Sequence, residues 1–199
     1  MSKFSILAGT ALIISVLGSS VSSAQPVASG DENVFVFGGP FTSDYFSDAL
    51  TPWNVEYESN FFAGVGYQRF LYQYGAFKLG VEGGLGLRAG YDSPTSFEAW
   101  GGAVARLEML ELGDVRITPS LTAGLSVVTG TIGVETERAE AIGQAVPILY
   151  YLGPEIAISH AALPEYEAFV RLQHRSGGFG TIAHIDGSNA ITAGVRYKF

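Results

Sequence analysis

The sequence predicts an all-β fold, an eight-stranded antiparallel transmembrane β-barrel. Three observations predict it. Apolar and polar residues alternate over long segments, charged residues lie inside these segments opposite the apolar face, and the connections alternate between long and short. The composition agrees, because 26 glycines, 13% aromatic residues and no cysteine are unusual for a soluble helical domain. We expect a signal peptide over residues 1–24 and one outer-membrane β-barrel over 25–199.

The N-terminus has the features of a secretory signal peptide. Lys3 precedes the apolar stretch 4–17, and small residues follow, with Ser22-Ser23-Ala24 as the expected cleavage site. A membrane helix is the alternative reading. The stretch is too short to span a bilayer, however, and it is followed by Ser, Gln, Pro and Gly.

The strands are predicted from alternation with period two. In 76–90 the odd positions from Phe77 onwards are mostly apolar, whereas Lys78, Glu82 and Arg88 lie on the other face. A soluble sandwich also alternates, but charges inside long strands are typical of a barrel with lipid outside and a polar lumen. The expected strands are 33–38, 57–73, 76–90, 97–112, 115–128, 145–159, 165–175 and 189–199. Within 57–73, Arg69 shares the parity of the outward apolar residues, so the register there stays open.

The connections and the C-terminus indicate the bacterial outer membrane. Long connections over 39–56, 91–96, 129–144 and 176–188 alternate with short turns near Gly75, Gly113 and 160–164. Outer-membrane barrels alternate long extracellular loops with short periplasmic turns in this way. The last segment, 193–199, resembles the terminal strand of such barrels, whose final Phe is read by the outer-membrane assembly machinery. We therefore expect that machinery as a partner.

Charge and composition exclude several classes of function. Without the predicted leader the chain loses Lys3 and no acid, so its net charge changes from −8 to −9, which argues against binding nucleic acid. Three histidines and no cysteine make a metal site unexpected, and we expect no cofactor. Two groups of residues receive structural interpretations: a charge run solvating a loop (Glu135, Glu137, Arg138, Glu140) and aromatic residues in interfacial girdles (Trp53, Trp100, Tyr150, Tyr151, Phe199).

Candidate chemistry lies near the end of the seventh predicted strand. His174 and Ser176 share the parity of Val170, so both project from the lipid-facing side, beside each other. An imidazole that takes the serine proton makes the hydroxyl a nucleophile for an ester. The glycines Gly177 and Gly178 offer backbone N–H groups to a developing oxyanion. The alternative is an interfacial His and Ser that bind lipid head groups beside a glycine-rich loop.

The segment from Arg171 to Phe199 resembles the C-terminal region of the PagL-type lipid A 3-O-deacylases. That family consists of eight-stranded outer-membrane barrels that act as serine esterases through a lipid-facing His–Ser–acid triad. The resemblance implies that His174 is the general base and Ser176 the nucleophile. Family members usually have Asn after the serine, where this chain has Gly177. Their acid, a Glu about a dozen residues beyond the serine, falls near Ser188, so Asp186 is the nearest carboxylate and our candidate.

Two functional hypotheses follow. The first is an esterase that removes an ester-linked fatty-acyl chain, at the 3-O position by resemblance, from lipid A of lipopolysaccharide in the outer leaflet. The second is a non-catalytic small barrel that is structural, adhesive or a minor pore. An eight-stranded barrel has an interior largely filled by side chains, which argues against a wide pore.

Overall fold

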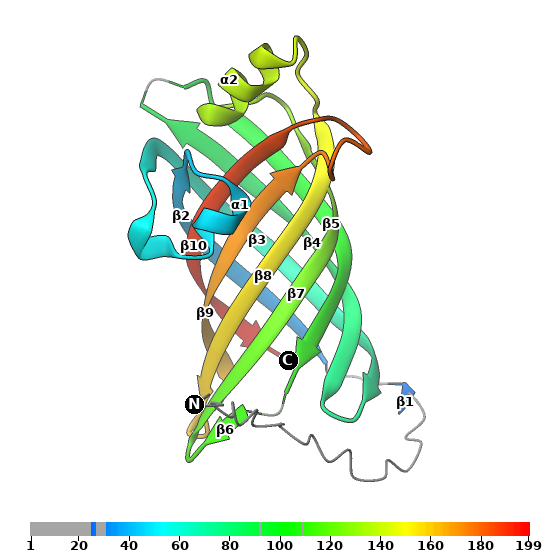
Figure 1. Cartoon of the computed structure of the whole chain (residues 1–199). Helices are drawn as coiled ribbons and strands as arrows, with labels where there is room; N and C mark the ends of the chain where they lie inside the picture. Colours follow the sequence, from blue (N-terminus) through cyan, green and yellow to red (C-terminus); the bar gives the residue numbers. More distant parts are fainter. Residues whose placement is uncertain (1–24, 27–30, 92, 109) are drawn as a thin grey trace, which may run out of the picture.

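The computed structural model describes residues 25–26, 31–91, 93–108 and 110–199, and the predicted signal peptide over 1–24 lies outside them. The chain forms a closed antiparallel β-barrel with short helices at one end (Figure 1). The strands are β1 (Gln25–Pro26), β2 (Glu32–Thr42), β3 (Tyr57–Tyr74), β4 (Phe77–Gly90), β5 (Ser96–Leu107), β6 (Leu110–Leu112), β7 (Val115–Val128), β8 (Ile148–His160), β9 (Leu163–Ser176) and β10 (Asp186–Lys198). The helices are α1 (Phe46–Ala49), the 3₁₀ helix η1 (Pro52–Asn54) and α2 (Val134–Ala141).

Eight long strands close the barrel, which confirms the predicted fold class. Each pairs with its neighbour in the chain, and β10 pairs back onto β2 through registers such as Gly194 with Phe37. The short strand β6 extends the turn between β5 and β7, and β1 adds to β3. Closure pairs the backbone groups of every long strand, which a water-free bilayer core requires.

Most observed strand boundaries lie within a few residues of the predicted ones, but the single strand predicted over 97–112 is divided into β5 and β6. The first long strand continues to Thr42 instead of ending at residue 38, passing through Pro40. Arg69, whose direction the sequence left open, follows the regular alternation of β3, and a register shift comes only after it, between Phe70 and Tyr72. Arg69 therefore points outward, where its Nε lies 3.4 Å from Glu32 Oε1.

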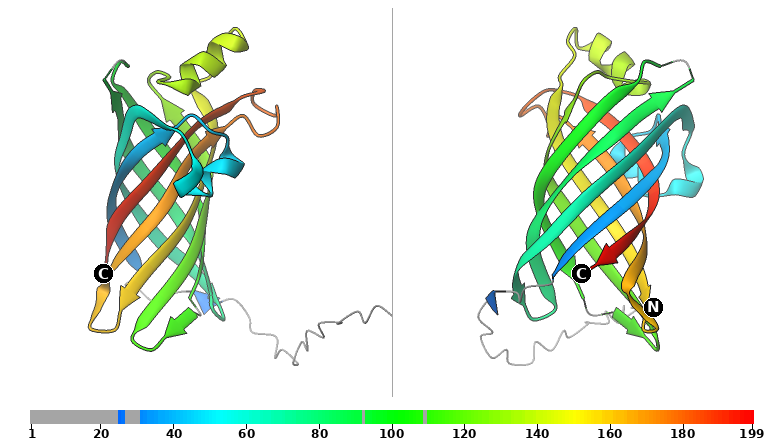
Figure 2. Two further views of the ribbon diagram at one scale, coloured as in Figure 1. Left: turned by 60° about the vertical axis from the view of Figure 1, so that its left-hand side comes forward. Right: turned by 180° about the vertical axis from the view of Figure 1, so that it is seen from behind.

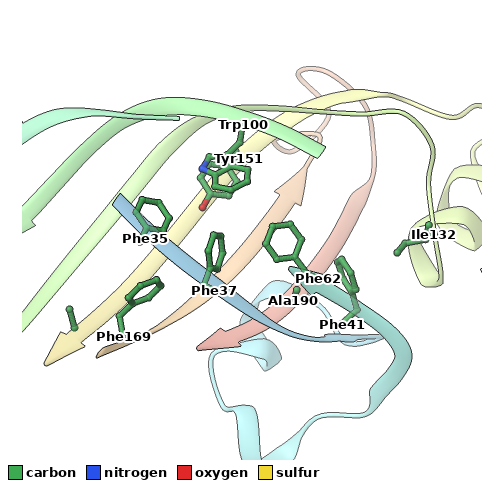
Figure 3. Close-up of a cluster of buried hydrophobic side chains, with 10 residues drawn as sticks. Phe35, Phe37, Phe41, Phe62, Trp100, Ile132, Tyr151, Phe169 and Ala190 are labelled. Carbon is green, nitrogen blue, oxygen red and sulfur yellow. The ribbon is translucent and has the colours of Figure 1, made fainter. Parts of the chain in front are cut away.

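Aromatic side chains fill the middle of the lumen (Figure 3). The rings of Phe35, Phe37 and Phe169 contact one another, and Trp100 packs edge-on against Phe37 with centroids 5.6 Å apart. The cluster also contains Tyr151, so the girdle positions predicted for Trp100 and Tyr151 are wrong. Both residues share the parity of charged lumen residues in their own strands. A Cβ at Gly84 would collide with the Trp100 ring, so a glycine makes room for it.

The lumen also holds a network of ion pairs. Within the described part of the chain, the buried charged residues include equal numbers of arginine and glutamate: Arg88, Arg106, Arg171, Arg175, Arg196, Glu82, Glu98, Glu135, Glu155 and Glu167. At its centre Arg171 reaches Glu82 and Glu155, each at 2.7 Å. Charges removed from water in this way are tolerable only when paired. Ion pairs and aromatic rings together fill the lumen.

Two helical connections lie at the end of the barrel that carries the long connections, which we call the loop end. The connection 43–56 folds down against the outside of the wall beside β9 and β10, and α2 lies across the mouth (Figure 2). In α2, Glu135 is buried and pairs with Arg88 and Arg175. The prediction that this charge run only solvates a loop is therefore wrong for Glu135. No helix in the described ranges is long and apolar enough to cross a membrane.

Breaking the central ion pairs will destabilise the barrel. Arg171→Met leaves Glu82 buried without its cation and Glu155 paired with Arg196 alone, so we expect the free energy of unfolding to fall by about 3–5 kcal/mol. The matched control is Arg116→Met, whose partner Glu111 is 2.7 Å away in an exposed pair, with an expected loss below about 1 kcal/mol. Urea unfolding in detergent micelles measures both. Equal losses for the two variants would contradict the structural role of the network.

Candidate active site

His174 and Ser176 lie on the outer wall near the loop end of β9. Outward and inward residues alternate along this strand, with Arg171, Gln173 and Arg175 buried in the lumen. His174 pairs with Asn189 of β10 on one side and with Leu152 of β8 on the other. The predicted placement of the two residues on the lipid-facing wall agrees with this geometry.

The connection 43–56 shields His174 although its side chain points away from the lumen. The imidazole ring packs against the Phe46 ring of α1, with centroids 4.5 Å apart. Phe46 also donates its backbone N–H to Asp186 Oδ2 at 3.2 Å. As a result His174 is only 6% exposed, in contrast to 56% for outward-facing Val170 on the same strand. The connection turns a membrane-facing histidine into a buried one.

Asn189 is the direct partner of the imidazole. Its Oδ1 lies 2.6 Å from His174 Nδ1, and its Nδ2 donates to the Asp44 carbonyl at 3.0 Å. The second bond fixes the orientation of the amide, so Oδ1 must be the atom that faces the ring. His174 consequently carries its proton on Nδ1, leaving Nε2 free to accept one.

Asp186, the predicted acid, lies beside this pair at a longer distance. Its Oδ1 is 3.6 Å from His174 Nδ1. Asp186 and Asn189 are three residues apart, yet both reach the ring, because β10 changes register between Asp186 and Ser188. An orienting amide and a nearby carboxylate therefore share the position at which the sequence predicts a single acid.

The predicted nucleophile and oxyanion donors occupy the rim of the same site. Ser176 shares the outward face with His174, and in the described structure no hydrogen bond joins the two side chains. Gly177 donates its N–H to the Ile185 carbonyl at 2.7 Å, so it is not free for an oxyanion. Gly178, at φ +61°, donates to no group within the described residues. It is the one of the two glycines with an available N–H.

A pocket of about 710 Å³ opens in front of these residues. It is lined by side chains from the connection 43–56, the ends of β8 and β9 and the last connection, including Tyr45, Phe46, Tyr150, His174, Ser176 and Asp186. Most of this lining is apolar, whereas His174, Ser176 and Asp186 contribute polar atoms. Such a pocket can accept an amphiphile with a polar group at the imidazole. Among the described residues, no cluster of His, Cys, Asp or Glu suitable for a metal ion occurs.

Arg138 of α2 connects the pieces that surround the site. Its guanidinium donates to the carbonyls of Ser43 at 2.7 Å and Asp186 at 3.0 Å, and it stacks over the Tyr45 ring at 4.7 Å. The connection 43–56 and the start of β10 are therefore tied to the same side chain. We call this set of contacts the Arg138 bridge.

Sequence reasoning missed four residues that shape the site: Asp44, Phe46, Arg138 and Asn189. A signal existed only for Asn189, which shares the outward parity of Ile191, Ala193 and Val195 in the last strand. The family spacing between the serine and the acid points to Ser188. The Ser188 side chain, however, faces the lumen and accepts a hydrogen bond from Arg88 at 2.9 Å. The other three act from loops whose packing no local pattern predicts.

Comparison with known proteins supports the fold. No family model and no curated protein matches the sequence. Among solved structures, the outer membrane enzyme PagL matches with a TM-score of 0.55 and 13% identity over 84% of this chain and 99% of that one. Neisserial surface protein A matches with a TM-score of 0.52 and 14% identity over 89% and 99%. A designed transmembrane β-barrel matches with a TM-score of 0.50 and 14% identity over 88% and 100%.

At these identities the likeness concerns the fold alone. The neighbours include an enzyme and a surface protein, so the fold is compatible with both functional hypotheses. The chain shares the fold of these outer-membrane barrels. What the site does must be argued from its own geometry.

Removing the Arg138 bridge will loosen the connection 43–56 without unfolding the barrel. Arg138→Ala deletes hydrogen bonds to two separate segments, so amide hydrogen exchange in 43–56 should accelerate by about tenfold or more. The control is Glu137→Ala, an exposed residue of the same helix, which should leave that exchange unchanged. Mass spectrometry of the exchanged peptides gives the measurement. Identical exchange in the two variants would show that the bridge does not restrain the connection.

Proposed function

We propose that the protein is an outer-membrane esterase that removes an ester-linked fatty-acyl chain from lipid A of lipopolysaccharide, at the 3-O position by resemblance. The observation that carries the proposal is the oriented imidazole of His174, held through Nδ1 by Asn189 and next to Ser176 on the lipid-facing wall. A histidine ordered this way, two residues from a serine at an open pocket, has the arrangement of a general base with its nucleophile.

The reaction follows from the positions of these groups. His174 Nε2 takes the proton of Ser176 Oγ as the oxygen attacks the ester carbonyl carbon, and the oxyanion forms near the Gly178 N–H. The intermediate collapses when the ester C–O bond breaks and His174 returns the proton to the departing sugar oxygen. Water, deprotonated by His174, then attacks the acyl-serine, releasing the fatty acid and restoring Ser176.

In this proposal, Asn189 and Asp186 together take the role of the acid in a catalytic triad. The amide oxygen of Asn189 keeps the proton on Nδ1, as the Asn of Cys–His–Asn hydrolases does. The carboxylate of Asp186, 3.6 Å from the same nitrogen, stabilises the imidazolium that forms during each half-reaction. Together they supply orientation and charge.

The location on the membrane side suits an amphiphilic substrate. A lipid in the outer leaflet reaches the outer wall by lateral diffusion, with its ester at the interface and its chains in the hydrocarbon. The filled lumen offers such a molecule no access. The site therefore lies where a lipid ester arrives already oriented.

A non-catalytic role, structural or adhesive, is the second candidate. Two observations favour it: in the described residues no hydrogen bond joins His174 to Ser176, and the Gly177 N–H is already engaged. Catalytic hydrogen bonds are often long in a free enzyme and shorten with substrate. Labelling with a serine-directed fluorophosphonate probe separates the candidates, because only an activated serine reacts and Ser176→Ala would abolish that reaction.

The purified protein should release fatty acid from lipopolysaccharide. Ser176→Ala should lower the rate by about 10³-fold or more because it removes the nucleophile. The control is Ser59→Ala at the loop end of β3, an exposed serine outside the pocket that should retain full activity. Mass spectrometry of the lipid products gives the readout. If the wild type releases no fatty acid, the proposed enzymatic function is wrong. If Ser176→Ala releases fatty acid at the wild-type rate, the assignment of Ser176 as the nucleophile is wrong.

Asn189 and Asp186 should contribute differently. Asn189→Ala removes the partner that sets the imidazole tautomer, so we expect a loss in kcat of about 10²-fold or more. Asn189→Asp keeps an acceptor at the ring and should retain far more activity than the alanine variant. Asp186→Asn preserves size and removes charge, which tests its electrostatic role. If Asn189→Ala has wild-type kcat while Asp186→Asn does not, Asp186 alone is the acid.

A further inference from the structure

A second hollow, of about 420 Å³, lies on the same outer wall beneath the connection 43–56. Its lining is almost entirely apolar and includes Leu50, Pro52, Pro154, Ile156, Val170 and Leu172. The barrel wall provides one side, and the segment from α1 to η1 provides the other, which we call the α1 roof (Ala49, Leu50 and Pro52). We call the hollow the roofed groove.

The roofed groove continues directly from the candidate active site. Along β9, Ser176 and His174 line the site pocket, and Leu172 and Val170 line the groove. Along β8, Tyr150 and Leu152 line the pocket, and Pro154 and Ile156 line the groove. At a rise of about 3.3 Å per residue, the stretch from Tyr150 to Ile156 spans about 20 Å. The two hollows thus form one path from the serine towards the middle of the bilayer.

The lipid surroundings of the roofed groove indicate that its occupant is a fatty-acyl chain. The surrounding wall is exposed and apolar, and Ile156 and Val170 at the far end of the groove are 44% and 56% exposed. An apolar hollow open to the hydrocarbon is filled by lipid, because neither water nor a polar segment is stable there. An outer-leaflet lipid presents its ester near the interface and its chain below, which is the order of pocket and groove along β8 and β9.

The α1 roof is anchored to the site itself. Ala49 is buried, Asp44 at the start of the connection accepts the N–H of Glu56 at 2.6 Å, and the Asp44 carbonyl accepts Asn189. Phe46 in the same helix packs on His174. A roof held in this way cannot move far from the groove without disturbing the imidazole. Its lower edge, at Leu50 and Pro52, limits the covered length of the groove.

We infer that the roofed groove binds the acyl chain of the substrate ester, and that the α1 roof makes the enzyme select chains by length. This inference rests on the proposed esterase function. A chain that fills the covered length gains apolar contact on two sides, whereas a shorter one leaves part of the groove to other lipid.

A tryptophan placed in the groove tests the inference. Val170→Trp fills the far half from an outward position that lipid already surrounds, so folding is preserved. Hydrolysis of p-nitrophenyl esters with chains of different length should show at least about a tenfold loss in kcat/KM for the longest chains relative to the shortest. The matched control is Val81→Trp, an outward valine of β4 on the opposite side of the barrel, with an unchanged chain-length profile. A profile identical in both variants overturns the inference.

A binding measurement separates failure of the groove from failure of the enzyme. Ser176→Ala protein in bilayers of a phosphatidylcholine with a diazirine on its acyl chain should crosslink more at 49–52 and 170–172 than at residues of equal depth on β4. Adding Val170→Trp should remove that excess. Equal labelling at the groove and at β4 would mean that only annular lipid contacts the groove, and this result overturns the inference. A wild type that hydrolyses no ester yet shows the excess labelling refutes the esterase and leaves the acyl-binding groove.

Discussion

Pairing of β10 with β2 is the constraint on which the rest of the structure depends. Closure of the sheet turns the alternation of each strand into a choice between lumen and lipid. That choice puts Arg171 and Arg175 inside, where they find glutamates, and His174 and Ser176 outside, where they meet the membrane. A shift of β9 by one residue would turn His174 into the lumen and expose Arg171 and Arg175 to lipid. The energetic cost of that exchange keeps the candidate site on the outer wall.

The packed lumen then supports the loop end. Arg88 and Arg175 extend the ion-pair network to Glu135, so α2 is attached to the barrel interior. From the same helix, Arg138 reaches the connection 43–56 and the start of β10. The imidazole of His174 is therefore oriented by a chain of contacts that begins in the lumen and ends outside it. Such a chain of contacts connects the site, which lies on the outer surface, to the packed interior of the barrel.

The surroundings of His174 show how a barrel can orient a histidine on its outer wall without an acid at the position expected from the family spacing. The change of register in β10 brings Asn189 into contact with the ring and Asp186 next to it. The connection 43–56 contributes twice, since Asp44 orients the amide and Phe46 excludes solvent from the imidazole.

The sequence by itself determined the strands, their closure into a barrel, the alternation of long and short connections and the outward direction of His174 and Ser176. These follow from period-two alternation, which is local and survives small errors in strand boundaries. The same alternation places Trp100 on the inward face of its strand, although its aromatic side chain suggested a position in an interfacial girdle. Only the tertiary structure decided that Asn189 contacts the imidazole, that Glu135 pairs with two arginines of the lumen and that α1 covers the groove. These features depend on a register change and on contacts such as Asp44 with Asn189, 145 residues apart, which no local pattern encodes.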